Sequence, residues 1–196
     1  MTSNNELRRK LRNARRRIPA PELHYASNLV CERIIDMPEF RKASRIAAYV
    51  GSQGEIDPMP LLRLAHELGK LCYLPVLHPF MRGRLWFAPW SPHSRMFLNP
   101  FGIPEPLFQP AQICKPQFFD VVLTPLLGFD RHCHRLGMGG GYYDRTFAFR
   151  NTRQQWKGPS LIGLAHAFQL TDRISTQPWD VQLDSVVTPD HLFLAD

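Results

Sequence analysis

The chain has 196 residues, 44% of them hydrophobic, and its 24 Lys and Arg outnumber its 17 Asp and Glu, which gives a net charge of +7. This length suits one hydrophobic core, so we expect a single domain over residues 1–196, and the lack of a run of about 18 apolar residues excludes a membrane span. The four cysteines form no CxxC pair and no apolar run follows the N-terminal charges, so we expect a cytoplasmic protein with reduced thiols, no zinc site and no secretory signal.

The first predicted element is a basic amphipathic helix. Seven of the ten residues from Arg8 to Arg17 are Lys or Arg, whereas an apolar set recurs at helical spacing and predicts one docked face: Leu7, Leu11, Ala14 and Ile18. A second face is either solvated or reaches an anion through its arginines: Arg8, Arg12, Arg15 and Arg16. A nucleic-acid-binding protein that uses this helix is the alternative to an enzyme, although the chain has no RNP, KH or zinc-finger pattern.

Helices and short apolar strands alternate along the rest of the chain. We predict helices over 21–37 and 60–68, and five buried strands over 45–50, 70–76, 118–127, 161–165 and 185–189. Seven prolines from Pro89 to Pro116 indicate a loop or a sheet edge there. This alternation is typical of an α/β fold, so we expect a mainly parallel sheet flanked by helices in a Rossmann-like three-layer architecture.

The segment RLGMGGGYYDR, residues 135–145, follows a predicted strand and opens the next helix. Its four glycines serve either a tight turn or a loop whose free N–H groups hold a phosphate. It matches neither GxGxxG nor GxxxxGK[ST], so it is not a dinucleotide fingerprint or a P-loop. Arg135 and Arg145 can neutralise phosphate charge, Asp144 can bind Mg²⁺, and Tyr142 and Tyr143 offer flat surfaces to a heterocycle.

A longer stretch around these glycines, GFDRHCHRLGMGGGYYDR (128–145), closely resembles the signature of the 5-formyltetrahydrofolate cyclo-ligase family. Further blocks agree in order and spacing: YVGSQGEID (49–57), VLTPLLGFD (122–130) and WDVQLDSVVTP (179–189). The resemblance implies an ATP- and Mg²⁺-dependent ligase that cyclises 5-formyltetrahydrofolate to 5,10-methenyltetrahydrofolate and releases ADP and phosphate. In the family, the formyl oxygen attacks the γ-phosphate, N10 then attacks the activated carbon, and phosphate leaves.

The resemblance also implies roles for individual residues. It makes Arg135, Tyr142 and Asp144 catalytic and Asp144 and Asp180 magnesium ligands. Residues implied to bind ATP are Arg8, Arg135, Leu136, Gly137, Met138, Gly139, Gly140, Gly141, Tyr142 and Tyr143. Residues implied to bind the folate are Val50, Glu55, Gly139, Gly140, Gly141 and Tyr142, where Glu55 could accept pterin N–H groups and Val50 could equally be core packing.

Two positions depart from the family pattern: Asn4 stands where lysine is usual, and Met138 where arginine or lysine is common. We expect a cytoplasmic monomer whose partner is a small folate, with or without a polyglutamate tail, and no nucleic acid or membrane partner. His132, Cys133 and His134 do not make a complete metal site. We expect structural roles in turns or at strand ends for Asp120 and Asp130, whereas Asp184 either caps a turn or, being close to Asp180, is a spare metal ligand.

Overall fold

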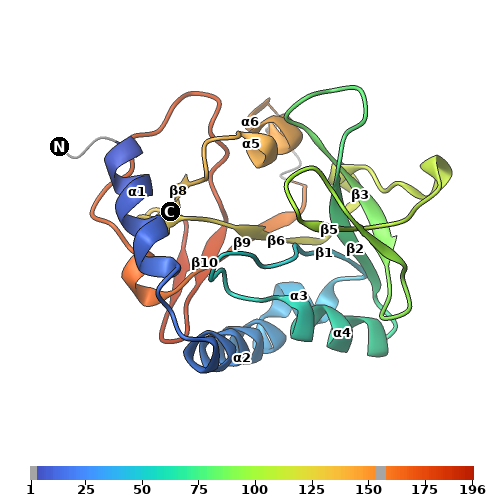
Figure 1. Cartoon of the computed structure of the whole chain (residues 1–196), viewed down its shortest axis with the longest axis horizontal. Helices are drawn as coiled ribbons and strands as arrows, with labels where there is room; N and C mark the ends of the chain where they lie inside the picture. The colour runs from blue at the N-terminus through green and yellow to red at the C-terminus, as the bar shows by residue number, and fades with distance from the viewer. Residues whose placement is uncertain (1–3, 153–157) are drawn as a thin grey trace.

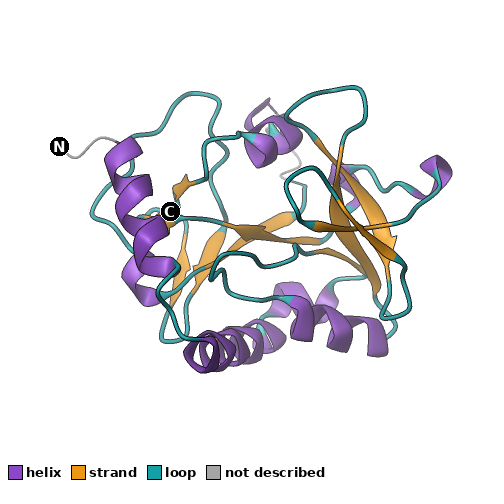
Figure 2. Ribbon diagram, in the orientation of Figure 1, coloured by secondary structure: helices purple, strands orange, loops and turns teal. Residues whose placement is uncertain are grey.

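A seven-stranded sheet forms the centre of the computed structural model, which describes residues 4–152 and 158–196 (Figure 1, Figure 2). Its order is β11-β10-β9-β6-β1-β2-β3; the five inner strands are parallel, and the edge strands β11 and β3 are antiparallel to their neighbours. In that order the strands span Leu192–Leu194, Ser185–Val187, Ser160–Leu164, Val121–Pro125, Arg45–Ala47, Leu71–Leu77 and Leu85–Trp90. Two small ribbons pair β4 (Met96–Leu98) with β5 (Pro104–Pro106) and β7 (Gly128–Phe129) with β8 (Arg135–Leu136).

Helices cover both faces of this sheet (Figure 1). One face carries α2 (Ala20–Asp36), α3 (Pro38–Lys42) and α4 (Met59–Glu67), and the other carries α5 (Tyr142–Phe147) and α6 (Phe149–Thr152). The first helix, α1 (Asn4–Arg15), lies beside β8, and 3-10 turns occupy Pro110–Gln112, Pro116–Phe118 and Ala167–Gln169. The predicted three-layer α/β fold is thus confirmed. Among the described helices, none combines the length and the apolar character that crossing a bilayer requires.

The order of the parallel strands changes direction between β1 and β6. The chain runs outward from β1 to β2 on one side, and from β6 through β9 to β10 on the other. Sheets of this kind bind ligands outside the carboxyl ends of the strands that flank such a point. We therefore expect a ligand site at the segments that follow Ala47 and Pro125.

All five predicted strands are present, with ends that differ from the prediction by a few residues. The elements that the pattern did not reveal are at the periphery: β3, β11, the β4–β5 hairpin and the short helix α3. β3 contains Pro89 and lies at the sheet edge, where one row of N–H groups needs no partner. The expectation of loop or edge structure for the proline-rich stretch is therefore confirmed.

The docked face of α1 differs from the prediction. Leu11 is buried against Leu127 and Leu136, as expected, but Ala14 is exposed and Arg15 takes the buried position, with 1% of its surface accessible. Leu11 and Arg15 are four residues apart and so share one side of the helix. Arg15 can be buried because its charge is paired inside the protein, as described below.

Candidate active site

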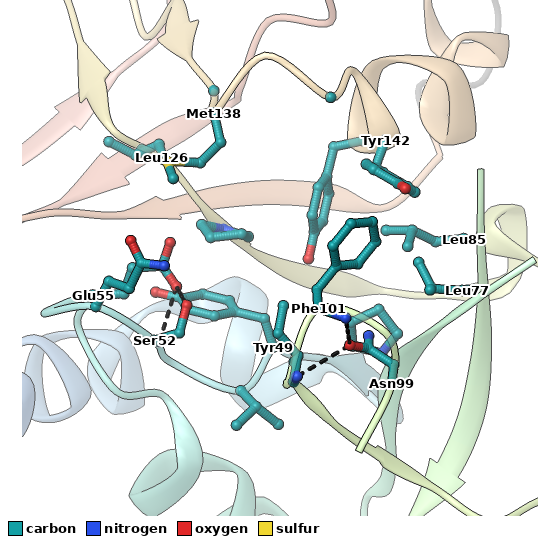
Figure 3. A pocket seen from close by; sticks show the side chains of 18 of the residues that line it. Tyr49, Ser52, Glu55, Leu77, Leu85, Asn99, Phe101, Leu126, Met138 and Tyr142 are labelled. Carbon is teal, nitrogen blue, oxygen red and sulfur yellow. Dashed lines mark hydrogen bonds between the residues drawn. The ribbon is translucent and has the colours of Figure 1, made fainter. Parts of the chain in front are cut away.

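A cavity of about 630 Å³ lies at the point where the strand order reverses (Figure 3). The loop after β1 contributes Val50, Ser52 and Glu55 to one wall, and the end of β6 contributes Pro125. The opposite wall comes from the end of β2, from β3 and from the β4–β5 hairpin: Leu77, Leu85, Asn99, Phe101, Ile103 and Glu105. In Figure 3, Met138 and Tyr142, on either side of the last glycines, lie above both walls. The cavity thus brings together segments that lie between Tyr49 and Asp144 in the sequence.

The glycine segment, residues 137–141, links β8 to α5 and lines the cavity with Gly137, Gly140 and Gly141. Gly139 and Gly141 have φ values of 102° and 61°, which glycine adopts readily, and Gly141 is the N-cap of α5. Across the described ranges, 4–152 and 158–196, no acceptor takes the N–H groups from Gly137 to Tyr143. A row of unused N–H groups at a turn and a helix start attracts anions.

Arg145 fixes the shape of this segment from outside the cavity. Its guanidinium donates to the carbonyl oxygen of Gly140 and, through Nε at 3.2 Å, to that of Gly83. A Cβ at Gly141 would lie 2.9 Å from Nη1 of Arg145, so the arginine and the bare glycine fit closely together. Arg145 therefore holds the loop, and Arg135 is the arginine of this segment that lines the cavity.

Arg135 is held rigidly at the cavity wall. Its side chain is 7% exposed, its Nη2 lies 2.6 Å from Oδ1 of Asp144, and its guanidinium carbon lies 5.3 Å from the ring centre of Tyr143. Burial raises the pKa of Tyr143 above its usual value, although the charge of Arg135 opposes that rise. The Nε of Arg135 is buried without an acceptor among the described residues. This charged group therefore retains a donor that an anion could use.

The two carboxylates expected to hold magnesium are placed differently. Asp144 lines the cavity; its Oδ1 accepts from Arg135 and, at 3.2 Å, from the N–H of Val181, so no described residue engages Oδ2. Asp180 lies outside the lining, and its Oδ2 accepts from the N–H of Gln177 at 2.8 Å. The structure therefore brings Asp144, and not Asp180, into the cavity with Arg135.

The helix α1 reaches both the glycine segment and the loop after β1. Arg8 donates from Nε to the carbonyl oxygen of Gly137 at 3.0 Å, so it lies beside the segment, as the resemblance implies. Two helical turns further on, Arg15 donates to the carbonyl oxygens of Gln53 and Leu126 and forms an ion pair with Oε1 of Glu55 at 3.2 Å. The anion that this helix reaches inside the protein is therefore Glu55.

Glu55 is a fixed carboxylate in the cavity wall. Its side chain is 11% exposed, and its Oε2 accepts from the N–H of Ser52 at 3.1 Å and from the Ser52 hydroxyl at 3.3 Å. Burial raises the pKa of Glu55 above its usual value, and the charge of Arg15 and the Ser52 donors oppose that rise. The loop is anchored further by His166, whose Nε2 donates to the carbonyl oxygen of Gly54 at 3.0 Å. The carboxylate is therefore oriented before any ligand arrives.

Of the remaining predicted residues, Val50 lines the cavity and also packs against the main core, so both of its expected roles are compatible with its position. Met138 is 44% exposed on the rim, and Tyr142 meets the ring of Phe101 edge to face at 6.3 Å. Leu136 is buried beneath α1, and Gly139 is exposed; neither lines the cavity. Asn4 donates to the carbonyl oxygen of Ser175 at 3.0 Å.

Sequence reasoning missed the hairpin wall of the cavity. Asn99, Phe101 and Glu105 lie in the proline-rich stretch, which has no periodic pattern from which to assign them a face. A signal was present nonetheless. Glu105 is the single charged residue between Arg95 and Lys115, an unusual position for a carboxylate that serves only solubility.

The three carboxylates with expected structural roles accept hydrogen bonds from backbone N–H groups. Asp130 is fully buried and accepts from the N–H groups of His132, His134 and Ile174. Asp120 accepts from two N–H groups at the start of β1, and Asp184 accepts from the N–H of Leu161. Within the ranges described, no three His, Cys, Asp or Glu side chains form a group that could hold a metal ion.

Comparisons with known proteins identify relatives of this chain. Residues 1–189 match the 5-formyltetrahydrofolate cyclo-ligase family. The 5-formyltetrahydrofolate cyclo-ligase of Escherichia coli K12 is 34% identical over 93% of this chain and 98% of its own, and that of Haemophilus influenzae is 36% identical over 93% and 95%. The NMR structure of Aquifex aeolicus 5,10-methenyltetrahydrofolate synthetase is similar with a TM-score of 0.81 at 28% identity, covering 97% of this chain and 92% of the other.

Proposed function

The chain belongs to the 5-formyltetrahydrofolate cyclo-ligase family, and from that premise we propose that its cavity binds 5-formyltetrahydrofolate beside ATP and closes it to 5,10-methenyltetrahydrofolate. The observation that carries the proposal is one cavity in which unused backbone donors and Arg135 lie opposite the buried carboxylate of Glu105 and the mostly buried carboxylate of Glu55. The backbone donors and Arg135 suit phosphates, and the carboxylates suit the N–H groups of a heterocycle.

The glycine segment fits the phosphates of ATP. Its N–H groups lack acceptors among the described residues, and Arg135 keeps a buried Nε without a partner. When bound, ATP supplies the phosphoryl group that turns the formyl oxygen into a leaving group. Arg135 would neutralise phosphate charge, and Arg8 and Arg145 would hold the loop through the carbonyl oxygens of Gly137 and Gly140.

Magnesium fits this end of the cavity through one carboxylate. Mg²⁺ is commonly bound by one or two carboxylates together with substrate phosphates and water, and Oδ2 of Asp144 is not engaged by any described residue. Asp180 would contribute only if its bond to the N–H of Gln177 were given up. We therefore assign the principal metal role to Asp144.

The wall after β1 fits the folate. Glu55 is oriented by Arg15 and Ser52 and retains lone pairs on both oxygens for pterin N–H groups, while Val50 offers an apolar contact. The role of these chain residues is to bring the formyl oxygen and N10 into line with the phosphates and to exclude water. No side chain needs to act as a nucleophile.

The nucleic-acid alternative has no support from these contacts. Arg8 and Arg15 turn toward the glycine segment and Glu55, and Arg16 donates to the side-chain oxygen of Gln53 at 3.0 Å. The basic helix serves the cavity rather than a separate surface.

The test is to mix the purified protein with ATP, Mg²⁺ and 5-formyltetrahydrofolate and to follow the absorbance of the methenyl product. We expect product formation that requires both ATP and Mg²⁺. A folded protein that forms no product would refute the proposed function.

A further inference from the structure

The hairpin wall of the cavity contains a buried carboxylate that has no cationic partner among the described residues. Glu105 in β5 is 5% exposed and lines the cavity. Its Oε1 accepts from the N–H of Leu77 at 3.1 Å and from Nδ2 of Asn99 at 2.7 Å. Among the described residues, Oε2 has no hydrogen-bond partner and no Lys, Arg or His forms an ion pair with the group.

Burying a carboxylate in this position costs free energy unless hydrogen-bond donors engage both of its oxygens. Acidic side chains are almost never fully buried without a partner, because removal from water penalises the charge. Glu55 meets that requirement with Arg15 and Ser52, whereas Glu105 has donors on one oxygen alone. Oε2 is not among the buried atoms that lack a partner, and Glu105 lines the cavity, so a ligand that fills the cavity can supply the missing donors.

The surroundings of Glu105 select a flat heterocycle. The same wall presents the aliphatic side chains of Leu77, Leu85 and Ile103. The rings of Phe101 and Tyr142 meet edge to face beside Leu77 and Leu85 (Figure 3). Glu55 and Ser52 lie on the other side of the space in that view. A planar ring between apolar side chains would place its edge, rather than its face, against the carboxylate.

Building on the proposed function, we propose that Glu105 binds the pyrimidine edge of the pterin of 5-formyltetrahydrofolate, with Oε2 accepting from its N3–H and 2-amino groups. These two groups are adjacent donors on one edge, and a carboxylate is an acceptor only. Adenine instead presents its amino group beside the ring acceptor N1, which would repel the carboxylate. The chemistry of Glu105 therefore favours the pterin over the adenine of ATP.

The variant E105Q separates this binding role from support of the hairpin. The glutamine oxygen can still accept from Leu77 and Asn99, so the contacts that hold the hairpin are retained. The amide nitrogen then takes the place of Oε2 and presents a donor to the donor edge of the pterin. A purely structural role thus predicts little change, and a binding role predicts a selective loss. Glu67, exposed on α4, gives the matched control E67Q with the same change in charge.

We would measure KM for 5-formyltetrahydrofolate and for ATP separately, and the affinity for 5-formyltetrahydrofolate alone by calorimetry. For E105Q we expect KM and Kd of the folate to rise about tenfold or more, as for loss of a charged hydrogen bond, with KM for ATP within about twofold of wild type. E67Q should match the wild type in all three quantities. In the wild type, an analogue of the folate without its 2-amino group should also bind about tenfold more weakly, a measurement that needs no folded variant.

Unchanged folate affinity in E105Q would overturn the inference, as would a rise in KM for ATP alone, which would place adenine at this wall. Equal affinity of the wild type for the folate and its 2-desamino analogue would overturn it as well. Failure of the proposed function would instead appear as a wild-type protein that forms no methenyl product, so the two failures are distinguishable.

Discussion

The two walls of the cavity each carry a buried carboxylate, and the chain treats them differently. Glu55 is paired and oriented before a ligand arrives, because Arg15 from α1 engages one of its oxygens and Ser52 from its own loop engages the other. Glu105 is held through one oxygen by its own hairpin and β2. One wall is therefore a preorganised part of the fold, and the other is completed by what binds. The difference predicts that changes on the Glu55 side lower stability as well as folate affinity, whereas changes on the Glu105 side lower affinity alone.

The largest expected effect comes from breaking the ion pair of the first wall. Arg15→Met leaves the Glu55 carboxylate buried without its cation, which should lower the free energy of unfolding by about 3–5 kcal/mol in urea titrations. Arg16→Met is the control, since Arg16 is exposed and should change stability by no more than about 0.5 kcal/mol. Adding Glu55→Leu to Arg15→Met should recover part of the loss, because no charge then remains unpaired. If Arg15→Met and Arg16→Met were equally stable, the difference drawn between the two walls would be contradicted.

The next effect concerns the phosphate end that both walls share. Asp144→Asn keeps the shape of the side chain but removes the charge that Mg²⁺ and Arg135 require, so turnover should fall about a hundredfold or more. Asp180→Asn is the informative partner, because the Asp180 carboxylate bonds to Gln177 outside the cavity and should matter much less. Turnover at a series of Mg²⁺ concentrations measures both. Similar losses in the two variants would restore Asp180 as an equal metal ligand.

A smaller effect separates ligand contact from backbone strain in the glycine segment. A Cβ at Gly137 would meet no protein atom within 4 Å, and Gly137 does not have positive φ, so Gly137→Ala should leave the melting temperature unchanged. If phosphates occupy that space, KM for ATP should rise about tenfold, because small displacements of a reacting group are costly. Gly139→Ala should instead cost about 1 kcal/mol of stability through its positive φ. A Gly137→Ala variant with normal KM for ATP would exclude phosphate from this position.

The smallest effect is a pH dependence of the first wall. Burial lowers the pKa of His166 below its usual value, so the unfolded chain binds a proton more readily than the folded one. Stability from this group is therefore full above the unfolded value of about 6.5 and declines as the pH falls below it. Urea unfolding at pH 7.5 and pH 5.5 should show a smaller loss in His166→Gln than in the wild type. Identical pH slopes would mean that protonation of His166 is not opposed by folding.

The sequence was sufficient for the parallel centre of the fold because its strands are short apolar runs, and β6, β9 and β10 are almost entirely buried. It was insufficient at the edges. β3 contains Pro89, and β11 (Leu192–Leu194) has two exposed leucines, so neither resembles a buried strand. The prediction for α1 was wrong at Ala14, which is exposed. Arg15 reaches an anion, which was one of the two alternatives for its face, but hydrophobic spacing could not identify it as buried, because its partner Glu55 lies 40 residues away.

The candidate site shows the same division. Arg135, Asp144, Glu55 and the glycine segment were predicted from one continuous signature and one short block, and all of them except Gly139 line one cavity. Glu105 was missed because its meaning depends on the strand β2 and on Asn99, which fold it into the cavity. The sequence could not tell the glycines of this segment apart: the positive φ values belong to Gly139 and Gly141, whereas a Cβ at Gly140 would meet the ring of Tyr142 at 2.8 Å.

The most direct test of the central claim, that one cavity holds phosphates at the glycine segment and the pterin between the two carboxylate walls, is an amide NMR titration. We expect a non-hydrolysable ATP analogue with Mg²⁺ to shift the N–H signals from Gly137 to Tyr143, and 5-formyltetrahydrofolate to shift those of Ser52, Glu55 and Glu105. Shifts from the ATP analogue confined to the exposed arginines of α1, with the glycine signals unchanged, would contradict the account.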